Sequence, residues 1–236
     1  MSSVILYLLK SSACTGILLL YYYIALRNKK MHRFNRFYLL GVMIVSIVIP
    51  LLQLHWTVRH TAISDVVPVE NLLNVINGQG EADSSTIAHD NWLSVYQVSF
   101  VMAAAISFFL LIKVQLGIFR VMQLKSRYAV TRKDRFNFIE TDLPQAPFSF
   151  LNNLFWRNDI DITTPAGKSI LAHELTHITQ KHTLDRIFAG TVSAIFWMNP
   201  FFYLIKKELS AIHEFLADEH AINDSNPQDF ALMLLH

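Results

Sequence analysis

Two histidines and a glutamate occur at a spacing that could bind one metal ion. They are His173, Glu174 and His177, within the stretch 170–178, whose apolar residues predict a helix. On a helix, residues four positions apart lie one above the other, about 40° apart around the axis. Two imidazoles so placed can bind one Zn²⁺, with Glu174 beside the metal to accept a proton from water. The pattern therefore favours a zinc site over a surface helix that carries these residues by chance.

A site of this kind needs a third protein ligand. The single cysteine, Cys14, lies in an apolar run near the amino terminus, so the zinc ligands must be histidines and carboxylates. His182 follows the motif most closely. If the helix continued, nine residues of rotation from His173, about 900°, would turn His182 to the opposite face. His182 is therefore interpreted as a helix-end or surface histidine.

The stretch 212–220 holds the remaining candidates. Glu214 and Asp218 are four apart on a predicted helix, which offers one carboxylate as a ligand and a second to orient a ligating imidazole. His213 and His220 are the alternatives in this stretch. His213 points about 100° away from Glu214, so the two cannot both face the metal. The residues alone leave Glu214, His213 and His220 open.

The composition is that of a membrane protein. Of the 236 residues, 53% are hydrophobic and 16% are charged, and the mean hydropathy is +0.33. Such a chain has too few charges for an ordinary soluble domain. Three apolar runs are long enough to span a bilayer, at about 4–26, 37–56 and 92–119. The first is interpreted as a retained helix, because its basic cluster follows the apolar run instead of preceding it as in a signal peptide.

The charges predict how these spans are oriented. The segment 27–36 contains five Lys or Arg, and 120–135 contains six, whereas 57–91 contains five acidic residues and one arginine. Because cytoplasmic loops are rich in Lys and Arg, we expect the amino terminus and an outer loop at 57–91 to lie outside. Everything after about residue 120 is then cytosolic. The basic segment between two spans is interpreted as a loop and not as a nucleic-acid site.

The chain is thus divided into a membrane domain, 1–122, and a cytosolic domain, 123–236. Alternating apolar and polar residues predict strands at 136–140 and 148–150, and 154–156 is expected to return as the second strand of a hairpin. Thr164 followed by Pro165 fits the N-cap and first position of the motif helix.

The apolar stretch 186–205 is long enough to be a fourth span. A full crossing, however, would carry Glu214 to the opposite side of the membrane from His173 and His177. Asn199-Pro200 interrupts the stretch, and proline breaks the helical hydrogen bonding. The prediction is therefore an apolar helical hairpin, buried in the domain or dipping into the inner leaflet, with 123–236 wholly cytosolic.

With both motifs placed, the chain resembles the BlaR/MecR-type membrane zinc metallopeptidases, the peptidases of the beta-lactam sensor–transducers. The resemblance rests on the three spans and on an ordered series of segments at 146–150, 173–177, 180–185, 196–200 and 213–219. Transducers of this family continue into a further span and an outer sensor domain, whereas this sequence stops at His236. It is expected to be either a fragment or a short member, namely the peptidase part without the sensor domain. Sensing of beta-lactams is not implied.

The resemblance implies a mainly α integral membrane protein with a cytosolic zincin-like α+β metallopeptidase domain that includes a small hairpin or sheet. It implies a Zn²⁺ ion held by His173, His177 and Glu214, with Glu174 as general base and Asp218 behind the ligands. It also suggests an edge strand on which a substrate backbone pairs by β-addition. That strand consists of Phe148, Ser149 and Phe150.

The expected function is a membrane-embedded zinc endopeptidase of the antirepressor type in the bacterial inner membrane. It would cleave a cytosolic protein, either a transcriptional repressor or the chain itself. Membrane lipid is an expected partner, nucleic acid is not, and self-association is allowed. The alternatives are a housekeeping protease resembling the heat-shock and CaaX-processing class, or a non-proteolytic signalling module with a structural zinc. Glu174 argues against the last, because a structural site needs no base.

Overall fold

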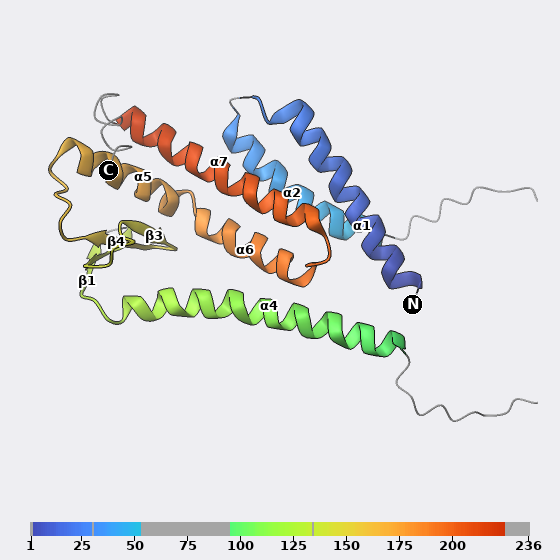
Figure 1. Ribbon diagram of the computed structural model, residues 1–236. Coiled ribbons are helices and arrows are strands. Elements are labelled where there is room, and N and C mark those ends of the chain that lie inside the picture. Colours follow the sequence, from blue (N-terminus) through green and yellow to red (C-terminus); the bar gives the residue numbers. More distant parts are fainter. Residues whose placement is uncertain (1, 30, 53–94, 134, 225–236) are drawn as a thin grey trace, which may run out of the picture.

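The computed structural model describes residues 2–29, 31–52, 95–133 and 135–224 of the chain, and this part is mostly helical with a small sheet (Figure 1). The amino-terminal helices are α1 (Ser2–Tyr21), the π-helical turn η1 (Tyr22–Leu26) and α2 (His32–Leu51). They are followed by α4 (Val95–Lys125), the strands β1 to β4, and the helices α5 (Pro165–Thr179), α6 (His182–Ile195) and α7 (Pro200–Asp224).

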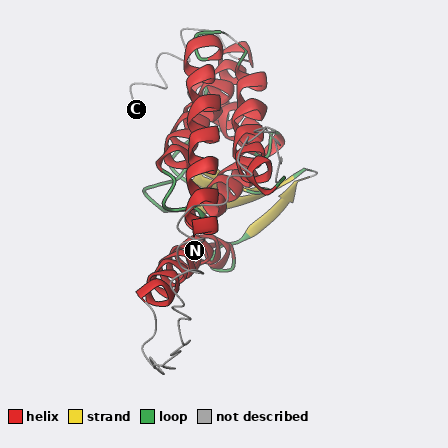
Figure 2. Ribbon diagram, turned by 90° about the vertical axis from the view of Figure 1, so that its right-hand side faces the viewer, coloured by secondary structure: helices red, strands yellow, loops and turns green. Residues whose placement is uncertain are grey.

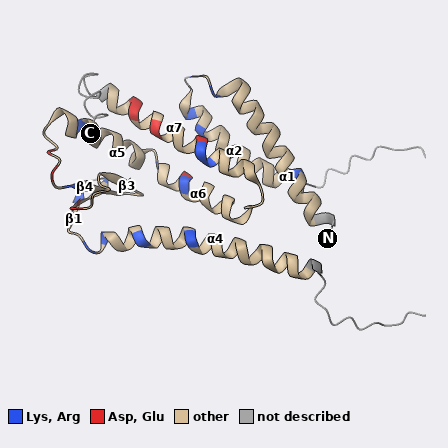
Figure 3. Cartoon of the chain, in the orientation of Figure 1, with Lys and Arg blue, Asp and Glu red and all other residues tan. Residues whose placement is uncertain are grey.

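Three of the described helices are long and apolar enough to cross a membrane, at Val4–Leu26, His32–Leu51 and Gln97–Lys125. This confirms the prediction of three apolar spans, although the second lies at His32–Leu51 instead of 37–56 and the third has a different end. The third was expected at 92–119, but the apolar helix continues to Lys125, and Lys and Arg gather toward this end of α4 (Figure 3). The expected outer loop 57–91, with positions 53–56 and 92–94, lies outside the described residues.

The second span begins at His32 and not at residue 37, so the basic segment 27–36 is only partly a loop. The reason is tertiary. Asn35 and Arg36 are buried, and the Asn35 side-chain amide donates to the carbonyl of Leu26 at 3.1 Å across the turn between η1 and α2. These contacts extend the helix into residues that local charge alone would assign to solvent.

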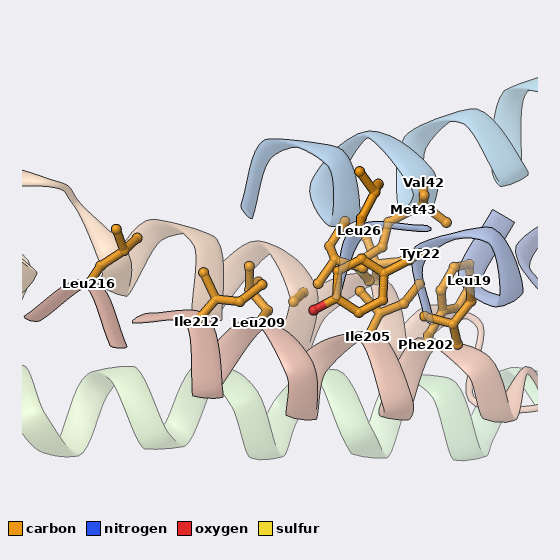
Figure 4. Packing of buried hydrophobic residues seen from close by; sticks show 13 residues of the cluster. Leu19, Tyr22, Leu26, Val42, Met43, Phe202, Ile205, Leu209, Ile212 and Leu216 are labelled. Carbon is orange, nitrogen blue, oxygen red and sulfur yellow. The ribbon is translucent and has the colours of Figure 1, made fainter. Parts of the chain in front are cut away.

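Helix α7 packs against the hairpin formed by α1 and α2 (Figures 1 and 4). Its buried residues recur every three or four positions, which is the period of one helix face. They are Phe202, Ile205, Leu209, Ile212 and Leu216. They meet Leu19, Tyr22 and Leu26 from the first helix and Leu39, Val42 and Met43 from α2. The long carboxyl-terminal helix is therefore built into the membrane part of the protein.

The predicted helix–break–helix arrangement at 186–205 is confirmed, because α6 ends at Ile195 and α7 begins at Pro200. Asn199 stabilises the break: its side chain accepts from the amide of Phe201 at 3.1 Å and donates to the Thr15 hydroxyl at 3.1 Å. On the other side, the Ser107 hydroxyl donates to the carbonyl of Ile195 at 2.8 Å. Thr15 and Ser107 lie inside candidate spans, so the tip of this hairpin lies alongside the spans.

The described part contains one four-stranded sheet, built from β1 (Val130–Lys133), β2 (Phe136–Thr141), β3 (Phe148–Phe150) and β4 (Asn153–Arg157). The strand order is β1-β2-β4-β3, with β2 and β4 parallel and the other pairs antiparallel. The predicted strands are confirmed, and β3–β4 is the expected hairpin. Strand β1 was not predicted, because its four residues are all exposed and show no apolar alternation.

Strand β3 is an edge strand, and it lies against α5. The sheet sits beside the helices, next to the carboxyl end of α4 (Figures 1 and 2). The motif helix begins as predicted: the Thr164 hydroxyl accepts from the amide of Gly167 at 3.0 Å, and Pro165 follows at the first helical position. This start fixes which face of α5 turns toward β3.

We expect labelling of single cysteines to place both ends of the α6–α7 hairpin on the same side of the membrane. With Cys14 replaced, cysteines at the exposed positions Lys168, Lys181 and Lys207 should all resist a membrane-impermeant reagent in intact cells. The reason is that the hairpin turns back at Asn199 without crossing.

Permeabilised cells provide the control, in which all three positions should react. Labelling of position 207 from outside, with position 168 still protected, would mean that the apolar stretch crosses the membrane.

Candidate metal centre

Helix α5 presents His173 and His177 on one face, with their Nε2 atoms 3.3 Å apart. Helix α7 returns antiparallel to α6 and brings Glu214 to the same place. The Oε2 atom of Glu214 lies 3.5 Å from Nε2 of His173 and 3.8 Å from Nε2 of His177. Three ligand atoms of the types that zinc prefers therefore converge from two helices.

The spacing of these atoms fits a zinc ion. In a tetrahedral site with metal–ligand bonds of about 2.0–2.1 Å, ligand atoms lie roughly 3.3–3.4 Å apart. The observed separations of 3.3, 3.5 and 3.8 Å exceed this by at most a few tenths of an ångström. The three groups thus need only a small inward movement to share one metal, and a fourth position is left for water or substrate.

Two further side chains contact two of the candidate ligands, Glu214 and His173. Arg186, in the first part of α6, donates to Oε1 of Glu214 at 2.7 Å, which leaves Oε2 facing the histidines. Asp218 lies one turn beyond Glu214 on α7, and its Oδ1 is 3.0 Å from Nδ1 of His173. The two groups interact electrostatically, and the Asp218 carboxylate helps to raise the pKa of His173. The carboxylate lies where metal-binding histidines commonly find their outer partner.

Burial and charge shift the pKa values of all three candidate ligands. Burial lowers the pKa of His177 to about 4, so its imidazole is neutral at neutral pH. The hydrogen bond with His173 lowers the pKa of Glu214 to about 2, which keeps this carboxylate ionised. Burial lowers the pKa of His173, but the hydrogen bond to Glu214 and the nearby carboxylates outweigh it and raise the pKa overall. Negative charge therefore accumulates where a cation would sit.

Glu174 lies next to the centre and contacts the sheet. Burial raises the pKa of its carboxyl group, and a hydrogen bond from the Ser149 side chain partly opposes this. Ser149 is the middle residue of the edge strand β3. The structure thus joins two features that the sequence analysis placed separately, the glutamate of the motif and the predicted edge strand.

The structure also distinguishes among the three residues that the sequence left open as third ligand. The His213 side chain is fully buried, and its Nε2 lies 3.0 Å from Oδ2 of Asp185, away from the pair. His220 lies on the far side of α7, where its Nε2 is 3.4 Å from Nη2 of Arg33. Of the three, Glu214 is the one that contacts His173 and His177.

His182 was interpreted as a helix-end or surface histidine; it does lie at a helix end, as the first residue of α6, but the surface alternative is wrong. Its side chain is only 1% exposed, and its Nδ1 lies 2.8 Å from Nδ1 of His177. The expected rotation assumed that the helix continues, but α5 ends at Thr179 and Lys181 takes a left-handed conformation with φ of 58°. The chain therefore turns, and α6 begins at His182, directly behind the metal centre.

Four residues at the site had been given no role from the sequence: Arg36, Gln180, Asp185 and Arg186. Arg36 and Arg186 stand among other charged or apolar residues without a distinctive spacing. Gln180 and Asp185 fall within the segment 180–185 that carries the resemblance, but only the packing of α2 and α6 shows what they contact.

Comparison with known families finds a match in the carboxyl-terminal third of the chain. The family model described as the BlaR1 peptidase M56 matches residues 159–235, the segment that contains all three candidate metal ligands. The resemblance inferred from the sequence is confirmed, and the match indicates a metallopeptidase. No curated protein matches the chain.

Replacement of Glu214 by Ala should remove most of the bound zinc from the purified chain, because it deletes one of three ligands. The wild-type chain should carry close to one zinc, measured by mass spectrometry of the metal content. His220→Ala is the matched control on the same helix and should keep its zinc, since His220 contacts Arg33 and not the histidine pair. The ligand assignment is wrong if His213→Ala or His220→Ala loses the metal while Glu214→Ala retains it.

Proposed function

We propose that the chain is a membrane zinc endopeptidase that cleaves a cytosolic protein. The observation that carries this proposal is the convergence of two imidazoles and one carboxylate, 3.3 to 3.8 Å apart, beside the buried carboxyl of Glu174. Zinc-dependent hydrolysis needs this combination, with three protein ligands, an open position and a base. A purely structural zinc site is expected to be closed by four ligands instead.

Each residue then has a defined part. His173, His177 and Glu214 hold the metal, and Asp218 and Arg186 orient His173 and Glu214. Bound zinc supplies Lewis acidity that polarises a peptide carbonyl and lowers the pKa of water to about 7. The Glu174 carboxylate accepts the proton of the attacking water and passes it to the leaving amine. Its raised pKa suits this role, because a base must be able to hold the proton between the two steps.

The edge strand β3 is the proposed substrate-binding surface. An extended peptide can add to a sheet edge through main-chain hydrogen bonds, which bind the substrate independently of its side chains. The hydrogen bond from Ser149 to Glu174 places this edge beside the base. Phe148 stacks on Phe155 of β4 with ring centroids 4.6 Å apart, which stiffens the strand that would receive the peptide.

The proposed site lies close to the level at which α2 enters its apolar span. Phe215, next to Glu214, stacks on His32, the first residue of α2, with centroids 5.3 Å apart. A substrate would therefore be cleaved near the membrane surface. A cytosolic regulator brought to the membrane, or a segment of the chain itself, would meet this requirement. In the proposed topology the amino terminus is outside and residues 123–236 are in the cytosol.

Glu174→Gln should abolish peptide cleavage while leaving zinc bound, because glutamine keeps the shape of the side chain but cannot accept a proton. Loss of a general base typically lowers the rate by about 10²–10⁴-fold. Cleavage of casein as an unfolded probe, followed by mass spectrometry, measures the rate. Glu219→Gln, an exposed glutamate on α7, is the control and should cleave normally.

Normal cleavage by Glu174→Gln would contradict the proposed mechanism. It would favour a signalling module whose zinc has a structural role.

N-methylation of the substrate backbone tests the role of β3 without altering the protein. In a peptide taken from a casein cleavage site, methylation of amides flanking the scissile bond should raise KM, since the methyl group removes main-chain donors that pair with the strand. The same modification at the far end of the peptide is the control and should change little. Equal KM values for the two peptides would exclude strand addition as the binding mode.

A further inference from the structure

We propose that Arg36, on the membrane helix α2, is a positioning residue for the metal centre. It holds a buried polar chain that sets the orientation of His177 and so couples α2 to the site. This inference rests on the proposed function, since it concerns a ligand of the proposed zinc ion. Arg36 itself is remote from the ligand atoms and acts through Gln180 and Asp185.

Arg36 is buried, and each of its three guanidinium nitrogens has a hydrogen-bond partner. Its side chain is 9% exposed, and its Nε donates to Oδ2 of Asp185 at 2.5 Å. Its Nη2 donates to the carbonyl of Gln180 at 2.6 Å, and its Nη1 lies 3.5 Å from the Gln180 side-chain oxygen. A buried guanidinium is costly unless its charge is paired and its donors are satisfied. The position of α2 is therefore tied to α6 and to the end of α5.

The contacts of Arg36 fall on the turn that decides where His182 lies. Gln180 is the C-cap of α5, and a cation there stabilises the last carbonyls of the helix. Lys181 follows with a positive φ, and α6 then starts at His182. By holding both Gln180 and Asp185, Arg36 fixes the two helices on either side of the turn.

The proton positions follow from the ligand role of His177. A metal on Nε2 leaves the proton on Nδ1, which can then donate to Nδ1 of His182, 2.8 Å away. His182 must accept through Nδ1, so its own proton is on Nε2, which lies 3.3 Å from the Gln180 side-chain oxygen. The chain of hydrogen bonds that starts at the metal ligand thus ends on a residue that Arg36 holds.

A second route returns to the same arginine. His213 stacks on His182, with centroids 4.1 Å apart and planes within 15°. Its Nε2 donates to Oδ2 of Asp185 at 3.0 Å, the same oxygen that Arg36 contacts. His182 is thus held by Gln180 at its edge and by His213 on its face, and both depend on Arg36. Loss of the guanidinium would free the ring that fixes His177.

The experiment compares Arg36→Ala with Arg33→Ala in the full chain, purified in lipid nanodiscs. Arg33 is the matched control, since it lies on the same helix and contacts only the edge of His220 among the hydrogen bonds described. The primary readout is the rate of zinc transfer to a chelator. Loss of outer partners of metal ligands typically weakens metal binding by 10–100-fold, so Arg36→Ala should lose zinc about that much faster. For casein, kcat should fall while KM stays constant.

A conservative variant and a chemical rescue distinguish a positioning role of Arg36 from a general effect on folding. Arg36→Lys keeps the charge but cannot bridge Asp185 and Gln180 with one flat group, so it should fold and still release zinc faster than wild type. Arg36 also lines a cavity of about 640 Å³. Added guanidinium ions should therefore enter beside Arg36→Ala and slow its zinc release, whereas they should leave Arg33→Ala unchanged.

The coupling to His182 is tested by combining the variants. Residues that act through one network show non-additive effects. Arg36→Ala added to His182→Ala should therefore accelerate zinc release no further than His182→Ala alone. Independent, multiplying effects of the two substitutions would overturn the proposal, as would wild-type zinc release from Arg36→Ala or Arg36→Lys.

The outcome also shows which inference has failed. If the wild-type chain itself binds no zinc, the proposed function fails and the role of Arg36 falls with it. If the wild type binds zinc and cleaves casein while the Arg36 variants match it in both respects, only the positioning role is excluded.

Discussion

The structure depends on the turn that brings α7 back alongside α6. His173 and His177 are on one helix and Glu214 is on another, and the stretch between α5 and Glu214 is apolar enough to be mistaken for a span. Helix α6 ends at Ile195 and Pro200 opens α7, while the side chain of Asn199 accepts from the amide of Phe201 and donates to the Thr15 hydroxyl. Without this turn, the carboxylate and the two imidazoles could not meet within one chain.

The same turn attaches the candidate metal centre to two of the candidate spans. Helix α7 buries one face against α1 and α2, so the helix that supplies Glu214 also forms the main apolar core. Hydrophobic burial holds α7 against α1 and α2. The hydrogen-bonded side chains behind His177 fix the orientation of its ring. A buried arginine, an aspartate and two buried histidines are costly to desolvate, and each is compensated by a specific partner.

Much of this arrangement was predictable from the sequence. The apolar spans, three of the strands, the start of the motif helix and the hairpin at Asn199 follow from local patterns of hydropathy, turn residues and caps, which are strong signals over short distances. The start of α2 and the burial of His182 were not predictable, because both depend on tertiary contacts of Arg36 and on the left-handed turn at Lys181. The rotation per residue predicts which side chains share a helix face only within one uninterrupted helix. Its failure at Thr179 is why a buried partner of a metal ligand was interpreted as a surface residue.

The central claim is that one zinc ion is bound by His173, His177 and Glu214. X-ray absorption spectroscopy at the zinc edge of the purified chain tests it most directly, because it reports ligand types and distances without requiring a substrate. The account predicts a four-coordinate shell with two imidazoles and oxygen ligands at about 2.0–2.2 Å and no sulfur. A shell with three imidazoles, a sulfur ligand from Cys14, or an absence of bound zinc would contradict it.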